Sequence, residues 1–263
     1  MKIAFVVPAY NEEALIGRCL ESILRELARG DYDSDVVVVS NASTDRTAEI
    51  ARGFPGVRVV DEPVKGLVKA RQAGYVATDG ELIANVDGDC ALTPGWIDTV
   101  LTEFGKDERM VALSGPFIYD DLPLRQRALT RTWYGATYCM YVLDKYVLGV
   151  GGMLQGGNFI VRRSAMEKIG GFDTSIEFYG EDTDIARRIS KAGRLKWTFA
   201  LPMYSSGRRV TGEGFVRTGL RYAANYFAVN FGGRPVTRTH RDLRPENDNV
   251  RPEPVAARKR MKK

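Results

Sequence analysis

The chain has 263 residues, and its content of 44% hydrophobic and 27% charged residues is ordinary for a globular protein, which excludes collagen, coiled coil and wholesale disorder. Its 38 Lys and Arg against 33 Asp and Glu give a formal charge of +5. That excess belongs to the segment from Gly232 to Lys263, which holds ten basic and four acidic side chains, so the remaining 231 residues carry −1.

Strand and helix signals alternate through the first hundred residues. Short apolar runs predict strands at Ile3–Val7, Val36–Val39, Val57–Val60 and Glu81–Val86. Helical spacing and helix-start signals between them predict helices over Glu12–Leu27, with Asn11 as its cap, Thr44–Arg52, with Thr44 as its cap, and Leu67–Ala77. This order predicts an α/β fold with a mainly parallel, doubly wound sheet flanked by helices.

The second half is less regular. We expect strands at Val111–Ser114 and Phe159–Val161, a helix over Asp182–Lys191, and two stretches that mix aromatic residues with Arg, Arg125–Leu148 and Phe215–Phe231. Proline and charge dominate from Gly232 onward, which is typical of disorder. We therefore predict one domain over residues 1–231, with halves at 1–113 and 114–231, and a basic tail over 232–263.

Ligands of such sheets bind beyond the carboxyl ends of the strands. Four segments qualify: Pro8–Glu13, Ser40–Asp45, Glu62–Gly66 and Asp87–Asp89. The last is the most informative, because two carboxylates so close together raise each other's pKa unless a cation intervenes. Mg²⁺ or Mn²⁺ prefers such oxygen ligands together with substrate phosphates. A polar turn is the alternative, since Asp-Gly is a common turn dipeptide.

Two further clusters carry charge at helix starts. Lys65, Lys69 and Arg71 lie where the helix dipole favours anions, although a solvated basic face is the plainer interpretation. Glu181 and Asp182 open a later helix; they either complement its dipole or provide a general base for an acceptor hydroxyl. The three scattered cysteines indicate neither a disulfide framework nor a zinc site, and favour a reducing compartment.

Seven segments then follow in a familiar order: PAYNEE, SNASTDRTAEI, KGLVKARQAG, DGD, GGNF, GFD and GEDTDIARRI. Together they resemble the family 2 glycosyltransferases of the GT-A fold, over about Ile3 to Arg188. The resemblance implies a hexosyltransferase-type enzyme of class EC 2.4. Such an enzyme moves a sugar from a UDP- or GDP-linked donor to an acceptor hydroxyl by direct displacement, with inversion and with Mg²⁺ or Mn²⁺.

The resemblance also implies roles for individual residues. The donor side comprises Pro8, Ala9, Tyr10, Glu12, Asn41, Lys69, Arg71, Asp87 and Gly88. The metal falls to Asp89 and Asp87, the general base to Asp182 with Glu181 beside it, and the acceptor edge to Gly156, Gly157 and Asn158.

The sequence departs from the family pattern at two places. Ser40 and Asn41 replace a more usual pair of aspartates, which leaves the nucleotide base open, although the Asn41 amide oxygen still offers an acceptor. The only histidine, His240, lies in the tail, so we assign it no metal. Arg208 and Arg209 are candidates to approach the diphosphate when a late loop closes, with a basic surface turn as the alternative.

Partners and location follow less directly. The resemblance implies a carbohydrate or lipid-linked acceptor in the synthesis of a polysaccharide, such as one of the cell envelope, or of a glycolipid. The two aromatic–basic stretches suit core or homodimer helices, or contact with a membrane surface. We see no targeting segment and no signal of specific nucleic-acid binding. We therefore expect a cytoplasmic protein, and peripheral contact with the inner face of the membrane remains an open alternative. A non-catalytic nucleotide-sugar-binding or assembly protein and a nucleotidyltransferase remain alternatives.

Overall fold

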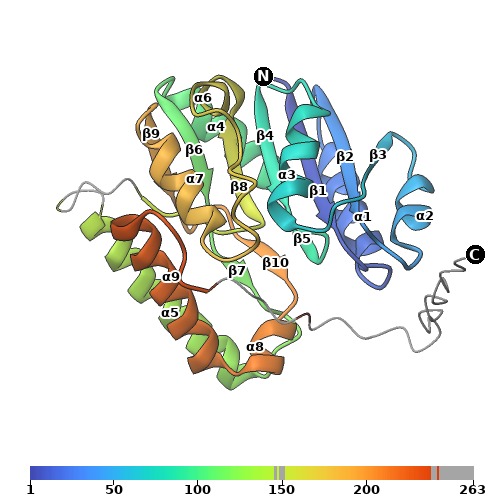
Figure 1. Cartoon of the computed structure of the whole chain (residues 1–263). Helices are drawn as coiled ribbons and strands as arrows, with labels where there is room; N and C mark the ends of the chain where they lie inside the picture. Colours follow the sequence, from blue (N-terminus) through green and yellow to red (C-terminus); the bar gives the residue numbers. More distant parts are fainter. Residues whose placement is uncertain (145–146, 148–151, 238–241, 243–263) are drawn as a thin grey trace, which may run out of the picture.

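A seven-stranded sheet organises the chain, of which the computed structural model describes residues 1–144, 147, 152–237 and 242 (Figure 1). Its strands lie in the order β3-β2-β1-β4-β8-β6-β9. They are β1 (Ile3–Ala9), β2 (Ser34–Asn41), β3 (Val57–Glu62), β4 (Leu82–Val86), β6 (Met110–Ser114), β8 (Asn158–Arg162) and β9 (Arg194–Trp197). All run parallel except β8, which pairs antiparallel with both β4 and β6.

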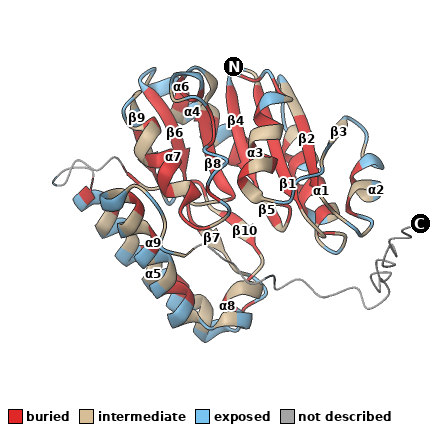
Figure 2. Ribbon diagram, in the orientation of Figure 1, coloured by how far each residue is buried: buried red, intermediate tan, exposed pale blue. Residues whose placement is uncertain are grey.

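Helices cover both faces of this sheet. One face carries α1 (Ile16–Leu27), α2 (Thr47–Arg52) and α4 (Trp96–Lys106). The other carries α3 (Leu67–Val76), α6 (Arg163–Lys168) and α7 (Glu181–Ile189). The three-layer α/β architecture confirms the predicted fold class, and the two buried layers of side chains between helices and sheet are its core (Figure 2).

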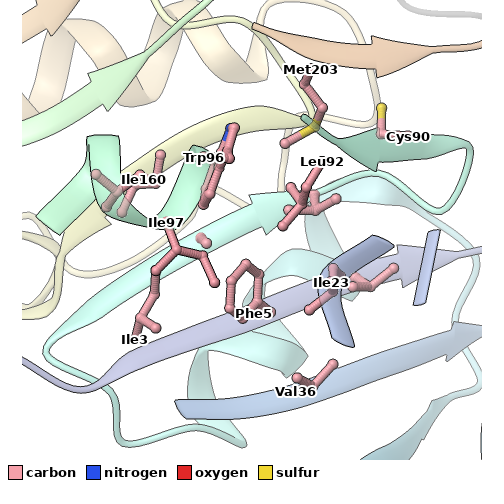
Figure 3. Packing of buried hydrophobic residues seen from close by; sticks show 14 of the residues in the cluster. Ile3, Phe5, Ile23, Val36, Cys90, Leu92, Trp96, Ile97, Ile160 and Met203 are labelled. Atoms are coloured by element: carbon pink, nitrogen blue, oxygen red, sulfur yellow. The ribbon is translucent and has the colours of Figure 1, made fainter. Parts of the chain in front are cut away.

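The alternation of β1 shows how the sequence builds these two layers. Ile3 and Phe5 point toward α1 and α4, whereas Val6 points toward α3 on the opposite face. Figure 3 shows Phe5 beside Trp96, the first residue of α4, with their ring centroids 6.0 Å apart. Because both faces of the central strands are buried, these strands read as continuous apolar runs rather than alternating ones.

A second, three-stranded sheet lies beyond the carboxyl ends of the main strands. It consists of β5 (Cys90–Leu92), β10 (Met203–Ser205) and β7 (Phe117–Ile118), in that order. The chain passes directly from β4 through Asp87, Gly88 and Asp89 into β5, so this acidic segment lies where the two sheets meet.

Three further helices lie in the second half of the chain. They are α5 (Leu124–Leu143), α8 (Arg208–Glu213) and α9 (Phe215–Gly232). In Figure 1, α5 and α9 lie side by side in the lower part of the view, outside the sheet and the helices that cover it. Both aromatic stretches are therefore helical where the structure describes them. His240 and most of the predicted tail lie outside the described residues.

Two predicted helix starts are wrong. The first helix begins at Ile16, because Asn11 adopts a φ of +48° and uses its side chain to accept the backbone N–H of Thr44, at 2.8 Å. The second begins at Thr47 rather than Thr44, and the Asp45 carboxylate accepts the Thr47 backbone N–H at 3.0 Å. The first departure comes from a contact between the first two loops, which local sequence signals do not contain, whereas the second comes from a contact only two residues apart.

Candidate active site

The segment Asp87-Gly88-Asp89 forms the centre of the site. It leaves the buried strand β4, and the backbone N–H of Cys90 donates to the Asp87 carbonyl at 2.9 Å, which turns the chain toward β5. Gly88 is buried against Ala9 and Glu12 of the first loop. The two carboxylates therefore project at the carboxyl edge of the sheet, where doubly wound folds bind ligands.

A fully buried guanidinium connects this segment to α7. Arg71 of α3 has no exposed side-chain surface; it donates to Asp87 at 2.8 Å and also to Glu181. A single positive charge thus lies between two carboxylates: Asp87 is 16 residues from Arg71 along the chain, and Glu181 is 110 residues from it. A donor phosphate cannot reach Arg71 in this arrangement, so the structure gives it the role of positioning Asp87 and Glu181, not the predicted contact with the donor.

Two consecutive glycines close the space between those carboxylates. The backbone N–H of Gly156 donates to Asp182 at 3.2 Å, and a Cβ at Gly156 would lie 3.1 Å from Glu181. Gly157 has a φ of +82°, and a Cβ there would overlap the Asp87 carboxylate. The predicted acceptor edge therefore touches both the Asp-Gly-Asp segment and the predicted base, which only residues without a side chain allow.

Asp182 has the properties of a general base. Burial raises the pKa of its carboxyl above the ordinary value of 3.8, while N–H groups of Thr183 and Gly156 favour the charged form. Burial also raises the pKa of Glu181 to about 8, against the opposing charge of Arg71. A carboxylate with a raised pKa accepts a proton more readily near neutral pH.

A pocket opens beside these groups at the ends of β1 and β2. Its lining residues are Pro8, Ala9, Tyr10, Asn41, Lys65, Gly66, Leu67, Ala70 and Phe178. The Lys65 ammonium lies 3.7 Å from the centroid of the Tyr10 ring. Aromatic faces, a cation and backbone groups at a helix start are features that suit a nucleotide. The pocket brings together four residues of the predicted donor side, namely Pro8, Ala9, Tyr10 and Asn41.

Asn41 holds the pocket wall in shape. Its amide nitrogen donates to the carbonyls of Glu62 and Val64, at 3.2 and 2.8 Å, and its oxygen accepts the backbone N–H of Gly66 at 2.7 Å. The oxygen that the sequence offers to a nucleotide base is thus already bonded within the chain. Lys69 lies close by, half-buried, with its stem against Gly66.

Arg208 of α8 reaches across the Asp-Gly-Asp segment. Its guanidinium pairs with both oxygens of the buried Glu12 and lies 2.8 Å from the Asp89 carboxylate. Of the two interpretations open for this arginine, a surface turn is excluded, because only 26% of its side chain is exposed. Arg209, next to it, instead lies over the Phe178 ring at 4.8 Å.

Asn158 is a framework residue, which differs from its predicted place at the acceptor edge. Its side chain is fully buried: its oxygen accepts the indole N–H of Trp96 at 3.2 Å, and its nitrogen donates to the carbonyls of Gly115 and Leu201. These bonds fix the amino end of β8, so Asn158 positions Gly156 and Gly157 and has no polar group left for an acceptor.

A Mg²⁺ or Mn²⁺ ion fits the oxygen donors of this site. Asp87 and Asp89 keep 30% and 15% of their side-chain surface exposed at the sheet edge. Within the described residues, no group of three or more His, Cys, Asp or Glu side chains is arranged to hold a metal. A hard cation here would therefore complete its coordination with donor phosphates and water, as Mg²⁺ commonly does.

Comparison with models of known protein families shows which family this chain resembles. The model of the family described as glycosyl transferase family 2 matches residues 4–170, well over half of the chain. The chain belongs to glycosyl transferase family 2. A second model, for the N-terminal domain of galactosyltransferase, matches residues 150–204, which include Gly156, Gly157 and the start of α7. The family resemblance inferred from the seven segments is confirmed.

Curated relatives agree at low identity. The chain is 26% identical over 208 residues to the probable glycosyltransferase YdaM of Bacillus subtilis, and 27% identical over 205 residues to the glycosyltransferase AglE of Haloferax volcanii. These matches cover 73% and 75% of this chain, but only 47% and 64% of those proteins. The chain thus spans about half to two-thirds of their length.

Two solved glycosyltransferase structures share the fold of this chain. A mannosyltransferase from Pyrobaculum calidifontis, solved with GDP-Man and Mn²⁺, gives a TM-score of 0.65 at 20% identity and covers 88% of this chain and 63% of its own. Glucosyl-3-phosphoglycerate synthase from Mycobacterium tuberculosis, solved with Mn²⁺, UDP-Glc and phosphoglyceric acid, gives 0.58 at 22% identity, covering 89% and 80%. The GT-A fold is confirmed.

One residue of the site, Phe178, and one contact, between Glu12 and Arg208, escaped sequence reasoning. Phe178 lines the pocket although it precedes the Gly180-Glu181-Asp182 motif in a segment without regular structure. Glu12 was placed on the donor side, but its partner Arg208 lies 196 residues away. The sequence did contain a signal for Phe178, since it lies between Gly171-Phe172-Asp173 and the motif Gly180-Glu181-Asp182. No local pattern, however, distinguishes an aromatic residue that lines a pocket from one in the core.

Proposed function

We propose that this chain is an inverting glycosyltransferase. It moves a sugar from a UDP- or GDP-linked donor to an acceptor hydroxyl by direct displacement, with Mg²⁺ or Mn²⁺ held by Asp89 and Asp87. The observation that carries the proposal is the bridge Asp87–Arg71–Glu181, because it fixes the Asp-Gly-Asp segment on one side and the amino end of α7 on the other.

The pocket beside Tyr10 suits the nucleotide of the donor. Its position at the ends of β1 and β2 leaves the diphosphate beside Asp87 and Asp89, at the sheet edge. A divalent cation there would neutralise the charge that develops on the leaving diphosphate. Arg208, already directed at Asp89, adds a second positive group at the same place.

Asp182 serves as the general base in this proposal. Its carboxylate lies at Gly156 and its pKa is raised by burial, so it is suited to take the proton of an acceptor hydroxyl as the hydroxyl attacks the anomeric carbon. Attack from the face opposite the leaving diphosphate inverts that carbon. Such a displacement requires no nucleophile from the protein.

Donor hydrolysis tests the reaction without knowledge of the acceptor. The full chain would be incubated with UDP- and GDP-sugars and Mn²⁺, and release of UDP or GDP measured. Asp89→Asn and Asp182→Asn should each reduce release about 100-fold or more, since each removes a group that acts in the transition state. Asp31→Asn, an exposed carboxylate away from the site, is the matched control and should leave the rate unchanged.

The same assay separates the alternative functions. A non-catalytic sugar-nucleotide-binding protein would gain thermal stability with one donor but release no nucleotide. A nucleotidyltransferase would instead form pyrophosphate from UTP or GTP and a sugar phosphate. A panel of UDP-, GDP- and dTDP-sugars that neither stabilises the chain nor reacts would count against all three.

The acceptor and the compartment belong to the proposal as well. We expect a carbohydrate or lipid-linked acceptor in polysaccharide or glycolipid synthesis, and activity in the cytoplasm. The backbone N–H of Gly156 donates to Asp182, which places the predicted acceptor edge directly beside the proposed base.

A further inference from the structure

The helices α5 and α9 form a parallel pair on the outside of the molecule. Trp133 of α5 lies against Gly219 and packs edge-on against Phe215, at 6.2 Å between centroids, near the start of α9. Farther along, Tyr226 of α9 donates to Asp144 just after α5. These contacts follow the same order along both helices, so the two run in the same direction (Figure 1).

The outer face of α9 is apolar although it faces solvent. Val216, Leu220, Phe227 and Phe231 are 70%, 65%, 45% and 68% exposed, and their spacing of four, seven and four residues places them on one side of the helix. On α5, Leu124 and Leu129 are also more than half exposed. Figure 2 shows exposed residues along both helices, in contrast to the buried strands. An apolar stripe of this length on a surface normally has a partner.

All the charged side chains of the two helices are positive. Over α5 and α9 there are five arginines and no aspartate, glutamate or lysine, which gives a charge of +5. Arg125, Arg131 and Arg217 are exposed. Arg221 is paired with Glu213 and lies toward Tyr179, so it belongs to the inner side. An apolar stripe with one exposed arginine beside Val216 and two more on the neighbouring helix is complementary to a surface that is itself apolar beneath an anionic layer.

We propose that the outer face of α5 and α9 docks on an anionic phospholipid bilayer. The stripe Val216, Leu220, Phe227 and Phe231 would lie among the headgroups and upper acyl chains, with the arginines on lipid phosphates. In this proposal the helices lie in the interface with their stripe toward the acyl chains. Among the described residues, no helix is long and apolar enough to cross a membrane. A second copy of the chain fits less well, because a symmetric contact would bring the exposed arginines of two such faces together.

The docking face is coupled in space to the candidate site. The inner side of α9 packs on the start of α7: a Cβ at Gly180 would lie 2.7 Å from Val229, and the rings of Tyr179 and Tyr222 are 5.8 Å apart. Glu181 and Asp182 follow immediately. If the proposed function holds, a membrane-bound chain therefore presents its base near the lipid surface, where a lipid-linked acceptor would lie. Membrane docking itself does not depend on the sugar chemistry.

Vesicle flotation of the full chain tests the docking face. Vesicles of phosphatidylglycerol and phosphatidylcholine, and of phosphatidylcholine alone, would be compared at low and high salt. We expect binding at least tenfold stronger to the anionic vesicles and weaker at high salt. Leu220→Ser combined with Phe231→Ser should lower it at least tenfold, as should Arg131→Gln combined with Arg217→Gln.

A matched control removes similar exposed apolar surface elsewhere. Val64→Ser with Val76→Ser, both side chains being more than half exposed and outside α5 and α9, should bind as the unchanged chain does. Each variant is checked by thermal unfolding, and Val216→Ser replaces any that fails to fold. The proposal is overturned if the unchanged chain does not float, or if the Leu220/Phe231 variant binds like the control. It is also overturned if light scattering finds a dimer that this variant disrupts while neither protein binds vesicles.

Discussion

The Arg208 guanidinium lies 2.8 Å from the Asp89 carboxylate, although 119 residues separate the two. The same guanidinium pairs with Glu12, whose side chain is only 4% exposed. The contact brings a positive charge from α8 to the carboxylates that we expect to hold a metal. Removing it takes away the guanidinium that these two carboxylates share, and breaking such a pair destabilises the fold unless a cation takes its place.

We predict that Arg208→Ala lowers the melting temperature of the metal-free chain by about 4–8 °C, corresponding to roughly 2 kcal/mol. Addition of Mn²⁺ should then stabilise this variant more than it stabilises the unchanged chain. The neighbouring Arg209→Ala, which leaves Asp89 and Glu12 paired, is the control. An equal Mn²⁺ shift in all three proteins would show that Arg208 and the metal act at separate places.

Arg71→Met should be more damaging to stability. The substitution keeps much of the side-chain volume but leaves Asp87 and Glu181 together without a cation, and breaking such a buried pair costs about 3–5 kcal/mol. Urea unfolding measures the change. Arg71→Lys should recover part of the loss, because one ammonium keeps the charge but lacks the planar fork that serves two carboxylates. Equal stability of Arg71→Met and the unchanged chain would contradict the proposed positioning role.

Gly157→Ala should abolish activity, with a fall of at least about 100-fold, as misplaced reacting groups typically cause. Its Cβ would push against the Asp87 carboxylate, and the backbone φ of +82° adds strain. Gly170→Ala provides a matched control, since Gly170 has a φ of +76° but no atom within 4 Å of the added Cβ. If the two variants hydrolysed the donor at comparable rates, the contact with Asp87 would not be the reason that residue 157 must be glycine for activity.

The rate of donor hydrolysis should rise with pH across an acidic limb set by Asp182. Burial raises the pKa of this carboxyl above 3.8, and a general base acts only when unprotonated, so the rate falls as pH drops through that raised pKa. Asp182→Asn should remove the limb along with about 10²–10⁴-fold of kcat/KM. A pH profile whose acidic limb is unchanged in Asp182→Asn would assign the limb to another group.

The apolar runs predicted the central strands well, because β1, β2 and β4 are buried on both faces. The direction of β8 was not predictable in the same way, since Phe159–Val161 reads alike in either direction. The strands β5, β7 and β10, of two or three residues, are too short for any periodic signal. The helix α4 was missed although Trp96, Ile97, Val100 and Phe104 repeat at helical spacing.

The carboxylates of the site were predictable because each follows a recognisable strand or opens a helix. The positively charged side chains that pair with these carboxylates were harder to assign. Sequence reasoning placed Arg71 against the donor, whereas the fold buries it between Asp87 and Glu181. Asn158 likewise looked like an acceptor residue, and only the packing of Trp96 and Leu201 around it shows a framework role. Such assignments depend on contacts between distant segments, which no local pattern records.

The antiparallel setting of β8 has a consequence for how this enzyme class diversifies. The chain leaves the main sheet after Ser114 and re-enters it at Asn158, and Ser114 pairs with Phe159 at the same edge. The intervening excursion, which includes α5, therefore begins and ends at neighbouring points. A different excursion could be grafted between those two points without altering any strand pairing of the main sheet. The α5 part of the proposed docking face could thus change while the carboxylates stay in place.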